Sequence, residues 1–346
     1  MNKSKWLACV VYAGIALLNQ SALAQQANNH AHHVHHSHHR GVDAPIGIMG
    51  DHVMPKGIYM MSYRYMRMDM DGNRVGSSRV SERDIVGTMA QPGQFMVAPI
   101  SMPMDMHMLG GMVGITDNIT LMGMINFVSQ EMDHLVRNGR MFTTESSGFG
   151  DSKISAVVKW VDQPDFKVNW SVGLSLPTGS IDERDDTPAM ENAFLPYPMQ
   201  LGSGTVDILP SITAIKYQGN WAFGAQLAAE IRTGENDEGY TLGDKFNATA
   251  WVVKEFSNRL SGSLRMDYVE RDNIDGINPD LNPMMVQTAN INLQAHQRLQ
   301  LGLGLSKQFN NGHRLALEYS RPIRQDVDGP QLEVDSVLTL GWQSAF

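Results

Sequence analysis

The most regular feature of the chain is an alternation of apolar and polar residues, repeated in segments of about ten residues after residue 56. In one such segment Ile154, Ala156 and Val158 share a face, and lysine and serine residues occupy the other. This period is typical of a β-strand with one apolar and one polar face. We expect twelve strands, at about 57–70, 101–115, 119–132, 150–161, 166–177, 205–217, 221–233, 245–256, 260–272, 298–309, 313–322 and 333–346.

The connections between these segments alternate strictly in length. Short turns such as 218–220 and 310–312 follow the even-numbered segments, and longer polar loops such as 178–204 follow the odd-numbered ones. Outer-membrane barrels have this asymmetry, with short turns in the periplasm and long loops outside the cell. The sequence therefore predicts an all-β fold, an antiparallel transmembrane β-barrel of the outer membrane with about 12 strands.

The last expected strand carries a further indication of a barrel. Leu338, Leu340, Trp342 and Phe346 share one face of this segment. A terminal Phe on such a strand resembles the signal read by the barrel-insertion machinery, although an ordinary edge strand ending in Phe is the alternative. We expect outer-membrane lipid and, during biogenesis, the insertion machinery as partners.

The N-terminal region differs in composition from the rest. Lys3 and Lys5 precede an apolar run at 6–18 and a small-x-small site at 22–24, the pattern of a secretory signal peptide. The run is too short for a transmembrane helix, which needs about 20 residues. We expect a signal peptide at 1–24, a disordered His-rich periplasmic tail at 25–55 and the barrel at 56–346, in the cell outer membrane of a Gram-negative bacterium. The single cysteine lies within the signal peptide, so no disulfide is expected.

Charge and motifs exclude several classes of function. The formal net charge is −9, and removal of Lys3 and Lys5 with the signal peptide makes it −11. This balance argues against nucleic acid as a partner and permits a lumen that attracts cations. The sequence contains no nucleophile elbow, phosphate-binding loop or HExxH motif. We therefore expect no enzyme and no required cofactor.

Two short motifs resemble a known family. Gly-Phe-Gly-Asp at 148–151 opens one expected strand, and Leu-Ser-Leu-Pro-Thr-Gly at 174–179 closes the next. They are similar to those of the outer-membrane transporter-like barrels named after the meta-pathway of phenol degradation. The resemblance covers most of the chain after residue 45 and implies a barrel with a transport role. The abundance of His and Met departs from the general family pattern and looks more like a subgroup associated with copper.

A histidine cluster lies in the expected tail. Its members are His30, His32, His33, His35, His36, His38 and His39. Neutral imidazoles are good ligands for Cu(II), Zn(II) and Ni(II), so the cluster predicts a flexible chelator. A polar tether without a metal role is the alternative.

Methionine is the second candidate ligand, with 24 residues in the chain. It forms stripes on three successive expected strands, at Met60, Met66, Met68 and Met70, at Met102, Met104, Met106, Met108 and Met112, and at Met122, Met124 and Met132. Thioethers suit Cu(I) and Ag(I), so copper or zinc is a possible cargo of such a barrel. The stripes have a second interpretation, because methionine is apolar and suits a lipid-facing surface.

The faces of the first two stripes are expected to differ. On the first strand Tyr59, Met61 and Tyr63 suit lipid, which leaves Met60 inside. On the second, Asp105 and His107 should point to the lumen as candidate metal ligands, with the methionines toward lipid. Further candidates, or a solvated rim, are Asp69, Asp71, Glu131, Asp133 and His134.

These features lead to one main hypothesis and two alternatives. The main one is an outer-membrane channel or transport component linked to copper or another soft or borderline metal, with metal ions as partner and cargo. A metal-sequestering barrel without throughput is the second. The third is a channel for a small hydrophobic or aromatic solute.

Overall fold

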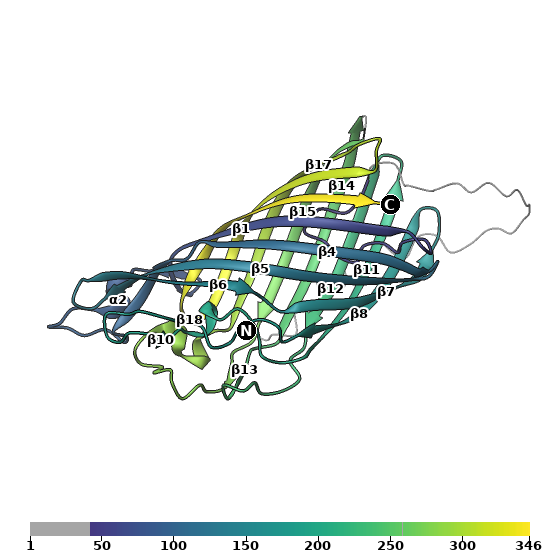
Figure 1. The fold of residues 1–346 in the computed structure, drawn as a ribbon. Coiled ribbons are helices and arrows are strands. Elements are labelled where there is room, and N and C mark those ends of the chain that lie inside the picture. The colour runs from purple at the N-terminus through teal and green to yellow at the C-terminus, as the bar shows by residue number, and fades with distance from the viewer. Residues whose placement is uncertain (1–41, 258) are drawn as a thin grey trace, which may run out of the picture. The chain divides into compact units, whose positions relative to one another are not determined.

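A single ring of antiparallel strands forms the wall of the molecule (Figure 1). The structure, a computed structural model, describes residues 42–257 and 259–346. The wall strands are β1 (Tyr59–Gly76), β4 (Met104–Thr116), β5 (Ile119–Val136), β7 (Ser152–Asp162), β8 (Phe166–Leu176), β11 (Asp207–Gln218), β12 (Trp221–Glu230), β14 (Lys245–Ser257), β15 (Leu260–Arg271), β17 (His296–Gln308) and β18 (His313–Ala345). Among these described strands β18 crosses the wall twice, pairing with β17 over 314–327 and with β1 over 327–345. The wall therefore has twelve passes, and the expected β-barrel is confirmed.

The ring closes between β1 and the second half of β18. Their register runs from Met60 opposite Ala345 to Gly76 opposite Val327. Tyr59 and Phe346 add two backbone hydrogen bonds, of 2.8 and 3.2 Å. A closed ladder leaves no strand edge exposed to lipid, which is the condition for spanning a membrane with strands. Separately, none of the helices in the described residues is long and apolar enough to span a membrane.

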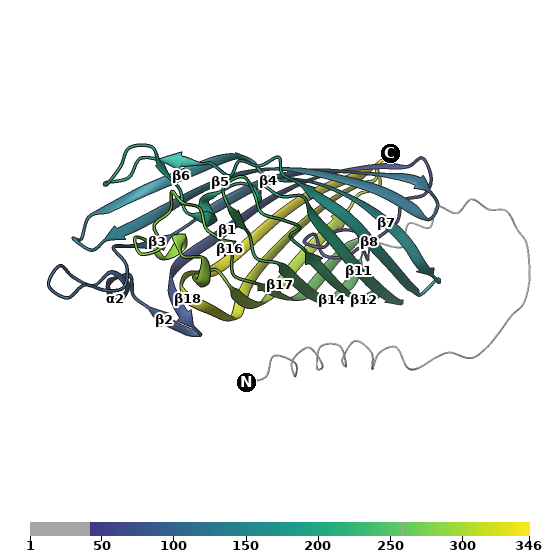
Figure 2. The same ribbon diagram turned by 90° about the horizontal axis from the view of Figure 1, so that it is seen from below.

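The connections separate by length to the two ends of the barrel (Figures 1 and 2). Short turns at 117–118, 163–165, 219–220 and 309–312 lie at the end that carries the C-terminus. The long connections at the other end contain β2 (Ser78–Val80), α2 (Glu82–Val86), β3 (Val97–Ser101), β6 (Met141–Phe149), β9 (Arg184–Asp185), β10 (Ala193–Phe194), η1 (Tyr197–Met199), β13 (Tyr240–Thr241), β16 (Asp275–Gly276), η2 (Gln287–Ala289) and η3 (Ile291–Leu293). By the rule for outer-membrane barrels, the short-turn end is periplasmic and the long-loop end is extracellular.

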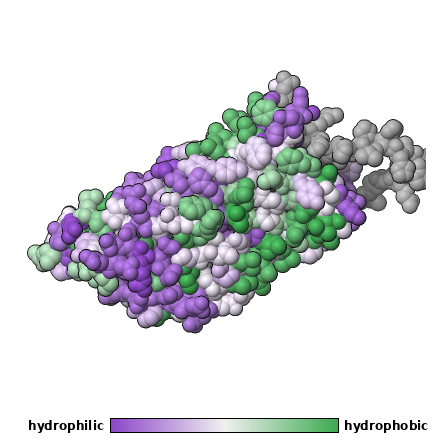
Figure 3. All heavy atoms as spheres, viewed as in Figure 1, coloured by the Kyte–Doolittle hydropathy of each residue, from purple (hydrophilic) through white to green (hydrophobic). Residues whose placement is uncertain are grey.

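Side chains along each strand alternate between an apolar outer face and a polar inner face. On β17, Leu301, Leu303 and Leu305 are 39–68% exposed, whereas Gln300, which precedes Leu301 and points to the inner face, is 6% exposed. Apolar surface covers much of the strands, and polar surface gathers at the end with the long loops (Figure 3). This arrangement is the inverse of a water-soluble protein. It is stable because lipid covers the apolar outer face and the inner polar groups bind one another.

Residues 42–56 lie inside the barrel. Val42, Ala44 and Ile48 pack in an apolar cluster with Ile215, Ala222, Trp251 and Val253 of the wall. Four inward side chains bind the backbone of this inner segment: Arg314 to Ala44 O (2.7 Å), Gln226 to Met49 O (2.7 Å), Asn169 to Asp51 O (2.9 Å) and Thr120 to Met54 N (2.7 Å). Because these partners come from β18, β12, β8 and β5, the inner segment crosses the lumen in its periplasmic half.

The inner segment overlaps the C-terminal part of the tail that we expected at 25–55. The sequence predicts a disordered tail through residue 55 because the region from residue 25 is, as a whole, polar and dense in histidine. In the structure residues 42–55 are held by inward polar side chains, which satisfy backbone groups that would otherwise be buried without partners. Residues 1–41, including the expected signal peptide and the remaining tail, lie outside the described residues.

The extracellular loops form a cap with apolar clusters of their own. One cluster contains Phe194, Tyr197, Tyr240, Ile274, Leu281, Val286 and Ala289. The cap is attached to the wall through polar contacts, for example Gln287 Nε2 to Asn73 Oδ1 at 2.5 Å. The long connections are therefore folded structure positioned over the extracellular end of the lumen.

Candidate functional site

Ten methionines of β1, β4 and β5 share the inner face of the barrel. This methionine wall consists of Met60, Met66, Met68, Met70, Met104, Met106, Met108, Met112, Met122 and Met124. The alternate residues Tyr63, Leu109 and Ile125 are 40–45% exposed on the outer face, whereas Arg64 and Met112 are under 10% exposed. The inward orientation expected for the stripe of β1 is therefore confirmed.

The register of the three strands brings methionines directly opposite one another. Met66 pairs with Met106, and Met68 pairs with Met104. Nearer the periplasmic end Met112 pairs with Met60 on one side and with Met122 on the other. Directly opposed side chains have Cβ atoms about 4.5–5.5 Å apart, so long side chains meet. Met60, Met112 and Met122 therefore form a row of three thioethers across three strands, called the methionine row below.

The orientation of β4 is the reverse of the one expected from its sequence. Asp105 and His107 lie on the outer face, and the methionines of β4 lie inside. Residues of β1 satisfy both polar side chains there: Tyr65 Oη donates to Asp105 at 2.5 Å, and Tyr63 Oη and His107 Nδ1 are 2.7 Å apart. Arg67 also binds Asp105, at 3.1 Å. These neighbours come from another strand, so β4 alone did not reveal them.

A second group of methionines is buried where the lumen meets the cap. Met102, Met132 and Met199 are 0–6% exposed and pack with Leu195, with Met70 at the edge. Met132 comes from β5 and Met199 from η1, and Met102 N donates to Met70 O at 2.9 Å. Since this group is closed and apolar, it fixes the cap to the wall, and the methionine wall is the part that borders the lumen.

The polar residues of the extracellular strand ends have ordinary structural partners. Asp69 binds Arg67 at 3.0 Å, and Asp133 accepts hydrogen bonds from Ser101 and Thr143. His134 is buried and stacks on Phe142, with ring centroids 4.6 Å apart. Across the part of the chain that the structure describes, no three His, Cys, Asp or Glu residues come together as a metal site. The candidate histidines at 30–39 lie outside the described residues, as do the expectations that rest on them.

The inner segment places an ion pair within the lumen. His52 Nδ1 lies 2.8 Å from Asp51 Oδ1. Burial tends to raise the pKa of Asp51, but His52 and the positive charge of Arg314 outweigh it and lower the pKa to about 2. Burial tends to lower the pKa of His52, yet the Asp51 carboxylate raises it. Charge thus complements the backbone contacts that hold the inner segment.

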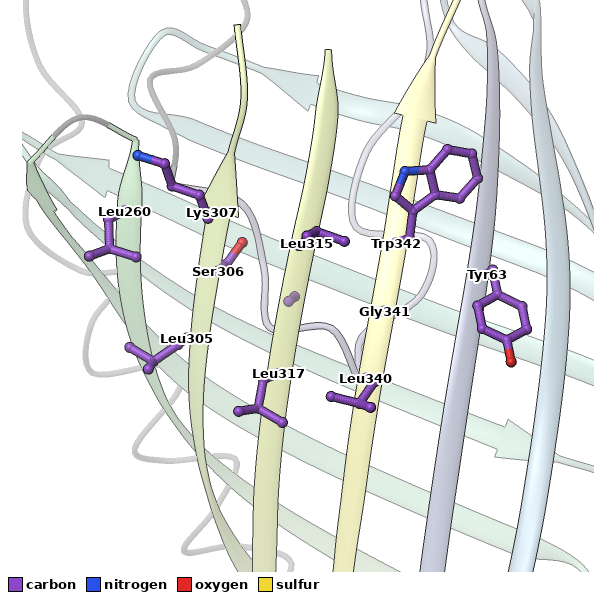
Figure 4. A pocket seen from close by; sticks show the side chains of 11 residues that line it. Tyr63, Leu260, Leu305, Ser306, Lys307, Leu315, Leu317, Leu340, Gly341 and Trp342 are labelled. Carbon is purple, nitrogen blue, oxygen red and sulfur yellow. The ribbon is translucent and has the colours of Figure 1, made fainter. Parts of the chain in front are cut away.

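Two hollows lie in the outer surface of the wall. One, of about 450 Å³, spans β15, β17, β18 and β1 and is lined by apolar side chains such as Leu305, Leu317 and Leu340 (Figure 4). Because these side chains face lipid, acyl chains suit this hollow better than a solute in transit. The other, of about 480 Å³, is lined mainly by outward-facing residues such as Met61 and Leu121, and it reaches the residues of the methionine row beside Gly111 and Gly123. The wall is thin there because glycine has no side chain.

One known structure with this fold is an outer-membrane channel. The COG4313 outer membrane channel from Pseudomonas putida F1 is similar to this chain, with 16% identity, a TM-score of 0.59 and coverage of 86% of this chain and 98% of the channel. A Pseudomonas aeruginosa FadL homologue is more distant, with 10% identity, a TM-score of 0.40 and coverage of 84% and 90%. The KdgM porin has 8% identity, a TM-score of 0.41 and coverage of 83% and 99%.

The sequence itself matches one family. No curated protein matches it. The family described as "Putative MetA-pathway of phenol degradation" matches residues 100–329, which is most of the wall from β4 to β18. This protein is thus a β-barrel of the Gram-negative outer membrane and belongs to that family.

Proposed function

We propose that this barrel is an outer-membrane channel whose lumen conducts soft metal ions, Cu(I) or Ag(I), along the methionine wall. The observation that carries the proposal is the methionine row, three thioethers opposed across β1, β4 and β5. Thioethers are soft ligands and bind these ions in preference to hard ones. Conduction needs sites that bind reversibly, and a wall of weak neutral ligands meets this requirement.

The histidine cluster of the tail extends the proposal to the periplasm. Seven imidazoles at 30–39 would gather Cu(II) or Zn(II) in the periplasm. In this scheme the tail and the methionine wall act on different oxidation states, because imidazole is a borderline ligand and thioether a soft one. Deletion of residues 25–41 therefore should lower binding of Cu(II) and leave binding of Ag(I) by the barrel intact.

Replacement of the methionine row by leucine tests the proposal directly. Met60→Leu, Met112→Leu and Met122→Leu together remove three sulfur atoms and keep the apolar volume, a change that cores tolerate. We expect the affinity for Ag(I) to fall by about tenfold or more, equivalent to ~1.4 kcal/mol. The measurement is Ag(I) titration of the refolded barrel lacking residues 25–41, with Ag(I) flux into liposomes as a second readout.

Met266 provides the matched control. It lies on β15 and is 44% exposed on the outer face, so Met266→Leu should leave affinity and flux unchanged. Equal Ag(I) binding by the parent barrel and the triple variant would refute a metal role for the methionine row. Binding of several ions without flux would instead identify a sequestering barrel.

A small hydrophobic solute is the second candidate cargo. Methionine side chains are apolar, and the hollow beside Gly111 and Gly123 brings the methionine row close to the lipid phase. The same leucine variant separates the two cargoes, because it preserves apolar character and removes only the sulfur ligands. Uptake of a small aromatic probe that survives the substitution, with no Ag(I) flux in the parent, would favour the hydrophobic solute.

A further inference from the structure

A row of charged side chains crosses four strands on the wall opposite the methionine wall. Glu230 of β12 pairs with Lys245 of β14, Lys245 pairs with Arg271 of β15, and Arg271 pairs with His296 of β17. In the order of the ring these strands lie across the lumen from β1, β4 and β5. All four residues lie at the extracellular ends of their strands, just below the cap.

These side chains point inward. Thr249, Asp267 and Gln300 share their faces of β14, β15 and β17 and are 4–6% exposed. The alternate residues Met266 and Leu301 are 44% and 39% exposed on the outer face. Arg298, two residues after His296, faces the lumen in the same way and lies opposite Val269.

Positive charge exceeds negative charge around this row. Five cations gather here: Lys153, Arg232, Lys245, Arg271 and Arg298. Three carboxylates lie near them, and all three already have ion-pair partners. Glu230 is bound by Lys153 at 3.7 Å and by Arg232 at 3.1 Å, and Asp207 is bound by Arg232. The nearby Asp267 is bound by Arg265 at 3.3 Å and by Thr249, Asn247 and Gln300.

Three of the cations have no ion-pair partner of their own, although the carboxylates of Glu230 and Asp267 are close enough to attract them. Among the residues that the structure describes, Lys245, Arg271 and Arg298 form no ion pair and no side-chain hydrogen bond. The Nε atom of Arg298 is buried without a partner. Lys245 and Arg271 are directly opposed, an arrangement of like charges that is destabilising in a sheet. A bound anion would remove both costs.

We propose that Lys245, Arg271 and Arg298 form an anion-binding site in the lumen, for a carboxylate or an inorganic oxyanion. Arginine presents a planar fork of donors that matches the geometry of carboxylate and phosphate oxygens, and lysine adds a point charge. A charged cleft with low-dielectric walls concentrates ions of opposite sign. The channel is therefore anion-selective, although the whole chain has a net charge of −9. This inference does not depend on the metal proposal.

Ion selectivity in planar bilayers tests the site. The refolded mature chain should give a reversal potential in a KCl gradient that indicates preference for chloride. Lys245→Gln, Arg271→Gln and Arg298→Gln together should lower the chloride-to-potassium permeability ratio by about tenfold, the low end of such focusing effects. Lys254→Gln is the matched control, because Lys254 lies on the outer face of β14, 4.7 Å from the ring of Trp221. Cation preference in the parent channel, or an unchanged ratio in the triple variant, would overturn the proposal.

A structural readout covers the case in which the inner segment prevents ionic current. Crystals of the mature chain soaked in bromide should show an anomalous peak within hydrogen-bonding distance of at least two of the three side chains. Bromide found only elsewhere would argue against the site. Ag(I) affinity should be unchanged in the glutamine variant, so the two proposals fail independently of each other.

Discussion

At the scale of single residues, buried ion pairs between inward-pointing side chains stabilise the interior of the barrel. Glu318 is 1% exposed, and its Oε1 accepts hydrogen bonds from Arg265 at 2.6 and 3.0 Å. The pair also borders the inner segment, because a Cβ on Gly47 would lie 3.0 Å from the Arg265 guanidinium. Removing one partner of a buried pair is costly when the other charge stays uncompensated, but here Asp267 also lies 3.3 Å from Arg265.

We expect Glu318→Gln to destabilise the barrel by less than the ~3–5 kcal/mol of an uncompensated buried charge, because Asp267 still faces Arg265. The measurement is the urea midpoint of the refolded barrel followed by Trp fluorescence. Glu131→Gln is the control, because Glu131 is exposed on the outer face of β5. A loss of stability no greater than that of the control would show that Arg265 finds another partner.

At the same scale, sequence reasoning failed where a side chain depends on another strand. Asp105 and His107 are polar, which suggested an inward orientation, but Tyr63 and Tyr65 of β1 satisfy them on the outer face. The charged row was missed for the same reason. Lys245, Arg271 and Arg298 are far apart in the chain, and only the register of β14, β15 and β17 brings them together.

At the scale of elements, alternation and turn spacing predicted the wall because both are local properties. Each of the twelve expected segments corresponds to a pass of the wall, with ends that differ by several residues on β1 and β5. The small strands of the cap were not expected, since pairs such as β13 with β16 depend on contacts between separate loops. The inner segment did leave a signal in the apolar alternation of Val42, Ala44, Ile46 and Ile48.

One glycine controls how the inner segment leaves the lumen. A Cβ on Gly114 would lie 2.0 Å from Pro55 O and 2.6 Å from Met54 O. The inner segment can therefore pass this point of β4 only because residue 114 has no side chain. We expect Gly114→Ala to displace the segment and raise single-channel conductance severalfold. Gly123→Ala is the control, because its Cβ would meet nothing within 4 Å. Unchanged conductance with proteolytic protection of residues 42–56 would mean that the segment adapts.

At the scale of the whole molecule, net charge was a poor guide to the lumen. The value of −9 permitted a cation-attracting interior, yet acidic residues such as Glu191 and Asp280 lie exposed in the loops. Meanwhile three unpaired cations face the lumen. The two proposed sites are compatible with one cargo, since Cu(I) and Ag(I) form anionic complexes with chloride. Methionine would then bind the metal while the opposite wall attracts its negative charge.

Closure of the barrel into a ring is a second property of the whole molecule. Phe346 completes the ladder with Tyr59 through two backbone hydrogen bonds. The expectation that the insertion machinery reads this residue stays a prediction from the sequence. Deleting Phe346 should lower the amount of folded barrel in the outer membrane severalfold, measured by heat-modifiable migration of membrane fractions. Phe309→Ala, in a periplasmic turn, serves as the control, and equal reductions in both variants would count against a specific signal.

The methionine wall has one more consequence, which concerns oxidation. A thioether that borders water is open to peroxide and hypochlorite, and methionine sulfoxide is polar where methionine is apolar. The ten methionines of this inner face are therefore candidates for oxidation, with Met112 the least accessible because it is buried. Oxidants reaching the cell surface would convert a soft, apolar lining into a hard, hydrated one. The leucine variant of the methionine row would protect only those three positions, because the other seven methionines of the wall would still be oxidised.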